Sequence, residues 1–219
     1  MLEGALGRIL GDVPRLSVAG RTDAGVHAEG QVVSFRTDVE PERIARSVNG
    51  MLAPEVAVVG AGRAPEGFDA RRSATSREYR YRVRTAEEPD PFTARYVWHR
   101  PGAYRLGAMR RAARLLEGEH DFTSFSRRAS GVSAVRRLSK LTVRPTGQEL
   151  VVGARADGFL HQMVRSLVGT LMVVGEQRME PEQMTEVLEA RSRAAAGPVA
   201  PPHGLTLVRV HYGRPRTTS

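Results

Sequence analysis

One carboxylate lies in an unusually polar, glycine-rich stretch, "AGRTDAGVHAEG" at 19–30. Asp23 is flanked there by Arg21 and His27, and the three glycines give the backbone freedom to turn. A lone carboxylate among cationic and polar neighbours is a candidate reactive group. An Asp in a turn can equally accept hydrogen bonds from nearby N–H groups and do nothing else. The stretch alone leaves both interpretations open.

Two later patterns could position further side chains. The segment "SREYRYRVRT" at 76–85 alternates strictly, which predicts a strand with Tyr79 and Tyr81 on one face and arginines on the other. The aromatic face is either core or part of a site. The segment 159–175 predicts a helix with a broad apolar side, whereas Arg165 aligns with His161 and Gly169.

Other kinds of site have weaker support. The six histidines form no pair at metal-ligand spacing with a carboxylate partner, so we expect no metal site. The absence of cysteine excludes a thiolate zinc site and a Cys nucleophile. The segment "GAGRAP" at 60–65 lacks the third glycine of a dinucleotide motif. In "EHDF" at 119–122, Asp121 is interpreted as a helix cap in preference to half of an acid–base pair.

The charge balance favours a polyanionic partner. The chain has 33 Lys and Arg against 24 Asp and Glu, a formal net charge of +9. Lys140 is the only lysine, so the charge is almost entirely guanidinium, which binds phosphate with two N–H groups. Nucleic acid is the natural partner, although an Arg-rich compositional bias would look the same. No run of 18 apolar residues and no secretory signal is present, so we expect a cytoplasmic protein without membrane association.

Helices and strands alternate along the chain, which predicts an α+β fold. The expected helices lie at 2–10, 41–52, 105–118, 159–175 and from near 181; the expected strands lie at 15–19, 31–35, 55–63, 76–85, in two parts of 136–157, and at 205–212. A change of character near residue 74 predicts two lobes. Residues 1–74 would carry the Asp loop, and residues 75–219 the Tyr strand and the Arg helix.

Five segments in order along the chain resemble one family. "GRTDAGVHA" at 20–28 closely resembles the signature of the tRNA pseudouridine(38/39/40) synthase family, which isomerises uridines at positions 38, 39 and 40 of the tRNA anticodon stem-loop. The other four are "FDARRSATSREYRYRV" at 68–83, "EHDFTSF" at 119–125, "FLHQMVRSLVGTLMVVG" at 159–175 and "APPHGLTLVRVHY" at 200–212. The resemblance implies two pseudo-symmetric lobes with a mainly antiparallel mixed sheet, flanking helices and an active-site cleft between the lobes.

The resemblance also implies a role for each of three site residues. Asp23 would be the nucleophile, Tyr81 would stack on uracil and relay a proton, and Arg165 would pair with Asp23. Whether Asp23 attacks C6 of the base or assists at the sugar stays open. The reaction implied needs no cofactor. A uridine in an RNA helix must be flipped out to expose these atoms, and a basic RNA cradle offsets the cost.

The expected partners follow from the same resemblance. Arg21 and His27 would hold the RNA beside Asp23, and Arg71, Arg72 and Arg77 would widen the cradle. The expected partner is the anticodon stem-loop of tRNA, and the expected assembly is a homodimer.

The sequence departs from the family at its beginning. Family members usually start with an extra strand after a Tyr-Asp-Gly-like turn, and the present sequence starts downstream of it, so we expect a missing first strand. An unpaired sheet edge beside the Asp23 loop would then cost stability. The alternative function is therefore a truncated, non-catalytic RNA-binding protein of the same fold.

Overall fold

The computed structural model describes residues 1–127 and 133–213. They form two compact units: unit 1 comprises residues 1–20 and 32–74, and unit 2 comprises residues 21–31 together with residues from 75 onward. The sequence pattern placed the Asp23 loop with residues 1–74, whereas residues 21–31 group with unit 2. The reason is a strand pairing: β2 (His27–Ala28) lies parallel to β9 (Leu205–Tyr212).

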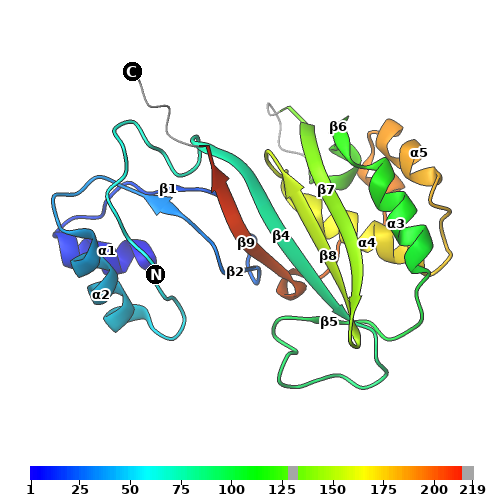
Figure 1. Cartoon of the computed structure of the whole chain (residues 1–219), viewed down its shortest axis with the longest axis horizontal. Helices are drawn as coiled ribbons and strands as arrows, with labels where there is room; N and C mark the ends of the chain where they lie inside the picture. Colours follow the sequence, from blue (N-terminus) through cyan, green and yellow to red (C-terminus); the bar gives the residue numbers. More distant parts are fainter. Residues whose placement is uncertain (128–132, 214–219) are drawn as a thin grey trace. The chain divides into compact units, whose positions relative to one another are not determined.

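Unit 1 is a helix pair packed with two short antiparallel strands (Figure 1). It contains α1 (Leu2–Leu10), β1 (Ser17–Val18), β3 (Val33–Ser34) and α2 (Pro41–Leu52). β1 and β3 are antiparallel. Leu6 of α1 and Ile44 and Val48 of α2 form the buried centre of this unit. The helices at 2–10 and 41–52 are confirmed, as are the two strands, which are shorter than expected.

The strand expected at 55–63 is wrong. No strand is assigned to these residues. The Asn49 side chain instead satisfies the backbone of Val58, accepting from its N–H at 2.6 Å and donating to its carbonyl at 3.0 Å. A side chain of α2 thus replaces the neighbouring strand that the apolar alternation had suggested, and Val59 is left 94% exposed.

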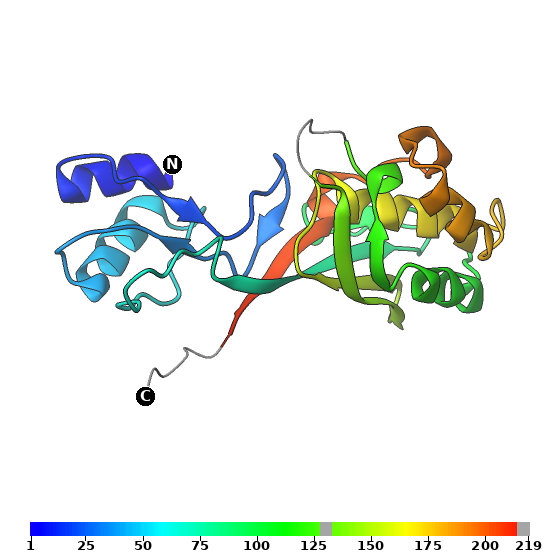
Figure 2. The ribbon, with the colours of Figure 1, turned by 90° about the horizontal axis from the view of Figure 1, so that it is seen from above.

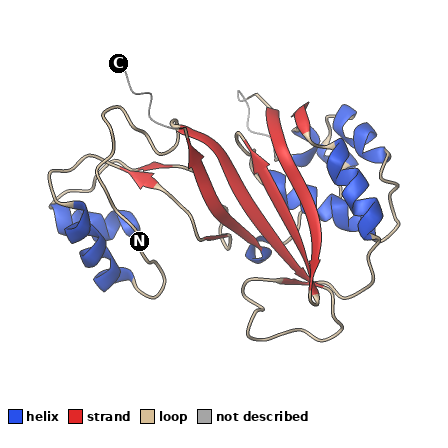
Figure 3. Ribbon diagram, in the orientation of Figure 1, coloured by secondary structure: helices blue, strands red, loops and turns tan. Residues whose placement is uncertain are grey.

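Unit 2 contains a seven-stranded mixed sheet (Figure 3). The strand order is β2-β9-β4-β8-β7-β6, with β5 paired to β4. The remaining bounds are β4 (Ala74–Arg84), β5 (Trp98–His99), β6 (Gly118–Asp121), β7 (Val135–Thr146) and β8 (Glu149–Ala156). β4, β8, β7 and β6 pair antiparallel in turn, whereas β5 runs parallel to β4. The α+β class and the mainly antiparallel mixed sheet are confirmed.

Three α-helices gather at the β7–β6 end of this sheet (Figures 1 and 2). They are α3 (Leu106–Leu115), α4 (Met163–Gly175) and α5 (Gln183–Glu189); short 3-10 turns are η1 (Thr123–Phe125), η2 (Arg193–Ala195) and η3 (Pro202–Gly204). Every residue of α4 except Arg165 is buried. This helix is therefore the centre of the unit 2 core, and Arg165 is the one residue of α4 that is not buried. No helix among the described residues is long and apolar enough to cross a membrane.

The helix expected at 159–175 starts four residues late. Gln162 is its N-cap, with a left-handed φ of 62°, and the Met163 N–H donates to the Leu160 carbonyl. His161 therefore lies in the turn before α4, not in line with Arg165 on the helix.

Candidate active site

The loop that carries Asp23 is a tight turn fixed to a sheet edge. The Val26 N–H donates to the Asp23 carbonyl at 3.0 Å, and Gly25 has a φ of 82°, which a side-chain-bearing residue rarely adopts. The N–H groups of Glu29 and Gly30 then both donate to the Leu207 carbonyl of β9. The turn is therefore closed by its own hydrogen bond, and its C-terminal side is tied to β9.

Arg165, in the first turn of α4, meets that carboxylate. Its Nη1 lies 2.7 Å from Asp23 Oδ2, and its Nε donates to the Ala200 carbonyl at 2.7 Å. The Ala200 N–H in turn donates to the Arg165 carbonyl at 3.1 Å. The side chains are 12% exposed for Arg165 and 24% for Asp23. The pair is thus sheltered, and the carboxylate remains accessible to a ligand.

Gly169 lets the 198–201 segment approach α4 closely enough to hold Arg165. A Cβ at this position would overlap the Pro198 carbonyl oxygen. Because this segment also supplies the Ala200 carbonyl, a larger residue at 169 would displace the acceptor of the Arg165 Nε.

His161 faces the other oxygen of the carboxylate. Its Nε2 lies 3.3 Å from Asp23 Oδ1, and its side chain is 48% exposed. Sequence reasoning gave this residue no role, although its alignment with Arg165 was a signal. The two oxygens of the Asp23 carboxylate are therefore contacted from two sides, one by Arg165 and the other by His161.

Tyr81 lies under the pair as a buried phenol. It is 0% exposed, and its hydroxyl donates to the Pro201 carbonyl at 2.7 Å. Burial raises the pKa of Tyr81 well above its usual range, and the nearby Arg165 charge opposes that rise. Its ring offers no exposed surface, so contact with a base requires an opening along the 201–204 segment.

Tyr79 lies two residues before Tyr81 on the same face of β4. The sequence left open whether this face is core or part of a site. Burial raises the pKa of Tyr79 to about 12; the Arg77 charge opposes this, and the Asp23 charge adds to it. Its ring packs edge-on against Phe159 at 5.1 Å. One strand therefore places two phenols beside the ion pair.

The two residues expected to flank Asp23 differ in how they are held. Arg21 is exposed. His27 donates from Nε2 to the Arg95 carbonyl at 2.8 Å, and its ring lies 4.6 Å from that of Tyr96. The loop before β5 thus fixes His27, which sequence reasoning did not anticipate.

The remaining arginines of the expected cradle are divided between the units. Arg71 and Arg72 belong to unit 1, and their main-chain N–H groups donate to Asp69 Oδ1 at 2.9 and 2.8 Å. These hydrogen bonds lower the pKa of Asp69. Arg77 belongs to unit 2 and donates from Nη1 to the Asp157 carbonyl at 2.8 Å.

Asp121 is the last residue of β6 and not a helix cap, because the N-cap of η1 is Phe122 and has no side-chain cap hydrogen bond. The Asp121 carboxylate is a local hydrogen-bond acceptor. Its Oδ1 accepts from the Thr123 N–H at 3.0 Å and hydroxyl at 2.6 Å, at the start of η1. These bonds lower the pKa of Asp121. Within 1–127 and 133–213, no three His, Asp or Glu side chains gather in a way that could hold a metal ion.

Comparisons with known proteins identify the family of this chain. Residues 112–213 match the sequence profile of a family described as tRNA pseudouridine synthase. A tRNA pseudouridine synthase A of Geobacter sulfurreducens is 41% identical over 217 residues, covering 97% of this chain and 88% of that protein. Proteins of the same name match from Methylobacterium nodulans (43%, 96% of this chain, 85% of that protein) and Frankia casuarinae (48%, 90% and 74%).

Proposed function

Because the chain belongs to the tRNA pseudouridine synthase A family, we propose that it isomerises uridines at positions 38, 39 and 40 of the tRNA anticodon stem-loop to pseudouridine. The observation that carries this proposal is the sheltered contact between Asp23 and Arg165. The Arg165 guanidinium holds one oxygen of the Asp23 carboxylate and fixes its direction, and a carboxylate positioned in this way can act as a nucleophile.

The reaction is an internal rearrangement of one nucleotide. The uridine leaves the RNA stack at a cost of a few kcal/mol and enters the site. Asp23 attacks the nucleotide, the N1–C1′ bond breaks, and the uracil turns. A C5–C1′ bond then forms, and the bond between the nucleotide and Asp23 breaks, which returns the free carboxylate. The proton lost from C5 is balanced by the one gained at N1. Atoms and electrons balance within the nucleotide, so the chemistry calls for no redox partner.

Arg165 and Tyr81 have distinct tasks in this proposal. Arg165 holds Asp23 Oδ2, which leaves Oδ1 as the attacking atom once the His161 imidazole has moved aside. A guanidinium suits the task because it remains charged when sheltered and fixes the carboxylate in direction. Tyr81 stays neutral through its raised pKa, so its hydroxyl can donate to a uracil carbonyl in place of the Pro201 carbonyl.

The basic side chains supply the affinity for RNA. Arg21, His27, Arg71, Arg72 and Arg77 are the proposed contacts to the tRNA backbone. Such contacts recognise shape and phosphate more than sequence, so affinity for tRNA should fall steeply as salt rises.

Release of tritium from C5-labelled tRNA tests the activity. The protein should release tritium from a tRNA that has uridine at 38, 39 or 40, and replacement of all three by cytidine should abolish release. Release that persists from the substituted tRNA would contradict the proposed positions. Tight tRNA binding without any release would favour the alternative, a non-catalytic RNA-binding protein.

The Asp23–Arg165 contact speaks against that alternative, since RNA binding alone has no use for a sheltered anion beside a polyanion. We extend the proposal to a homodimer, as the family resemblance implies, and to action in the cytoplasm, as the sequence analysis expects. Sedimentation equilibrium should give twice the chain mass; a monomer at micromolar concentration would contradict the dimer.

A further inference from the structure

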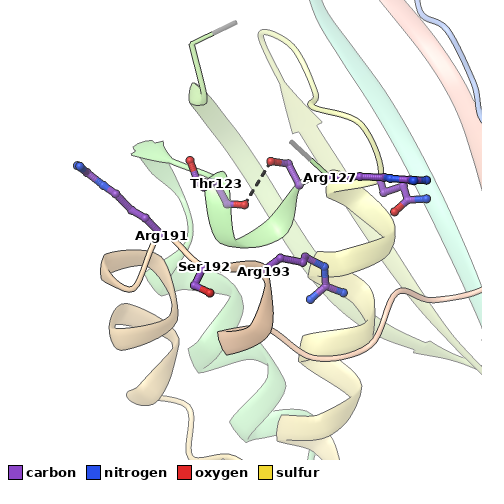
Figure 4. A pocket seen from close by; sticks show the side chains of 7 residues that line it. Thr123, Arg127, Arg191, Ser192 and Arg193 are labelled. Atoms are coloured by element: carbon purple, nitrogen blue, oxygen red, sulfur yellow. Dashed lines mark hydrogen bonds between the residues drawn. The ribbon is translucent and has the colours of Figure 1, made fainter. Parts of the chain in front are cut away.

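A hollow of about 570 Å³ opens beside the start of α4 (Figure 4). Its seven lining side chains are all polar or cationic, and none is a carboxylate. Three of them are Arg127, Arg191 and Arg193. The volume lies within the range of about 300–1,000 Å³ that is typical of ligand sites. The composition is that of a site for an anion.

The cations of the hollow are poorly neutralised by the protein itself. No carboxylate of the described residues pairs with Arg127 or Arg193. Among the described residues, Arg193 donates to the carbonyls of Ala196 and Gly197, at 3.2 and 2.8 Å, and burial lowers its pKa. Arg191 Nε lies 3.3 Å from Asp121 Oδ2, but its side chain is 69% exposed, so the pair is weak. A surplus of positive charge remains.

The walls of the hollow are held by hydrogen bonds that join separate segments. The Ser192 N–H donates to Ser124 Oγ at 2.9 Å, which ties the segment before η2 to η1. Gln162 and Arg191, both in the lining, have left-handed φ values of 62° and 44°. Such backbone persists only where the surroundings enforce it, so this shape is specified by the fold.

The hollow adjoins the Asp23 site through two consecutive residues. The Arg127 N–H donates to the His161 carbonyl at 3.1 Å, and the His161 imidazole faces Asp23 Oδ1. The next residue, Gln162, lines the hollow. An RNA strand with one nucleotide at Asp23 would therefore bring its neighbouring backbone to the arginines.

We propose that this hollow binds backbone phosphates of the substrate tRNA next to the reacting uridine. The inference rests on the proposed function and adds Arg127, Arg191 and Arg193 to the RNA contacts. Figure 4 shows Arg191 on the side of α5, with Arg127 and Arg193 directed toward α4. Cations spread in this way match successive phosphates along a strand better than one small anion, and each guanidinium can bind a phosphate bidentately.

The test compares two arginines with nearly identical surroundings. Arg178 pairs with Glu176 at 3.3 Å and is 68% exposed, which matches Arg191, but it lies beyond the far end of α4, about 20 Å along the helix. The variants are Arg127→Ala with Arg191→Asn, and the control Arg178→Asn. Asn is chosen because it tolerates a left-handed φ well.

The double variant should raise the Kd for tRNA about tenfold at moderate salt. The slope of log K against log salt should become shallower by about 0.7 for each phosphate that the protein no longer binds. In tritium release the effect should appear mainly in KM for tRNA, with a much smaller change in kcat. Arg178→Asn should leave the Kd, the slope and KM as in the wild type.

Equal Kd and slope for wild type and double variant would overturn the proposal. Titrations of the wild type and the variants with inorganic phosphate distinguish free phosphate from tRNA as the bound anion. If the variants lose phosphate binding while their affinity for tRNA stays unchanged, the proposal is also overturned. Arg127→Ala alone, at an exposed side chain, keeps the test valid should Arg191→Asn misfold. Failure of the wild type to release tritium would refute the proposed reaction but not the hollow, because the Kd comparison does not depend on turnover.

Discussion

The two ends of α4 are both surrounded by arginines, but they balance this charge differently. Beyond the C-terminal end, Glu176 accepts from Arg100 Nε at 2.6 Å and lies 3.3 Å from Arg178. Near the N-terminal end, Arg165 lies beside Asp23, and Arg191 lies beside Asp121. Arg127 and Arg193, by contrast, contact no carboxylate among the residues that the structure describes.

The helix dipole makes this difference informative. Positive charge is favourable at a helix C-terminus and unfavourable at an N-terminus, by about 0.3–1 kcal/mol per group at exposed sites. The arginines around Glu176 therefore stabilise the fold by themselves. The surplus positive charge at the N-terminal end interacts unfavourably with the helix dipole until an anion binds. This is expected of a surface that binds RNA phosphates.

Removing one guanidinium at each end of α4 should produce the largest difference between the two ends. Arg165→Met leaves Asp23 sheltered and without its main cation, so the free energy of unfolding should fall by about 3 kcal/mol and kcat for tritium release by about 100-fold or more. Arg178→Met, at an exposed pair, should cost less than about 0.5 kcal/mol. Urea unfolding and release assays measure both, and similar losses in the two variants would contradict the assignment.

High pH should destabilise the folded protein through the phenols near the N-terminal end of α4. The pKa of Tyr79 is raised from 10.0 to about 12, so the folded state retains a proton that the unfolded state loses. The Tyr79 contribution is constant below pH 10 and costs about 2 kcal/mol of unfolding free energy by pH 12. Tyr79→Phe should remove that part of the decline. Parallel pH dependence of the two proteins in urea unfolding between pH 9 and 12 would count against this.

Replacing a glycine by alanine should change stability in opposite directions at a closely packed position of α4 and at an open position of α2. Gly169→Ala overlaps the Pro198 carbonyl and should cost about 1–3 kcal/mol, with loss of activity because the Ala200 acceptor of Arg165 moves. Gly50→Ala in α2 meets nothing within 4 Å and should stabilise by up to about 1 kcal/mol. Denaturation midpoints measure the direction of the stability change in both variants. A Gly169→Ala variant as stable as the wild type would show that the 198–201 segment does not need its close approach to α4.

The smallest effect concerns the stability of the matched exposed pairs. Arg191→Asn and Arg178→Asn should each change the free energy of unfolding by less than about 0.5 kcal/mol. Their difference should appear only in tRNA affinity. A stability loss above about 1.5 kcal/mol for Arg191→Asn alone would mean that Arg191 holds the hollow together structurally.

The sequence predicted the core of the fold because its signals are periodic and local. The apolar pattern of α4, the alternation of β4 and the glycine-rich turn at Asp23 each reflect a side-chain arrangement within one element. The contact between Asp23 and Arg165, 142 residues apart, was reached only through the family resemblance. No local pattern encodes such a distance.

The misses arise where a side chain or a distant segment overrides the local pattern. Asn49 satisfies the backbone of Val58, so the apolar run at 55–63 pairs with no strand. Gln162 in a left-handed conformation delays the start of α4 and moves His161 beside Asp23. The arginine hollow was not predictable, because its residues come from three separate segments that only the fold brings together.

The central claim is that Asp23 is the reacting group, and its most direct test is a single-turnover experiment with Asp23→Asn at saturating protein. Asn keeps the shape and still accepts from Arg165, so tRNA should bind with a Kd within about twofold of the wild type while the rate of tritium release falls by about 10⁴-fold or more. A release rate within about tenfold of the wild type would contradict the claim.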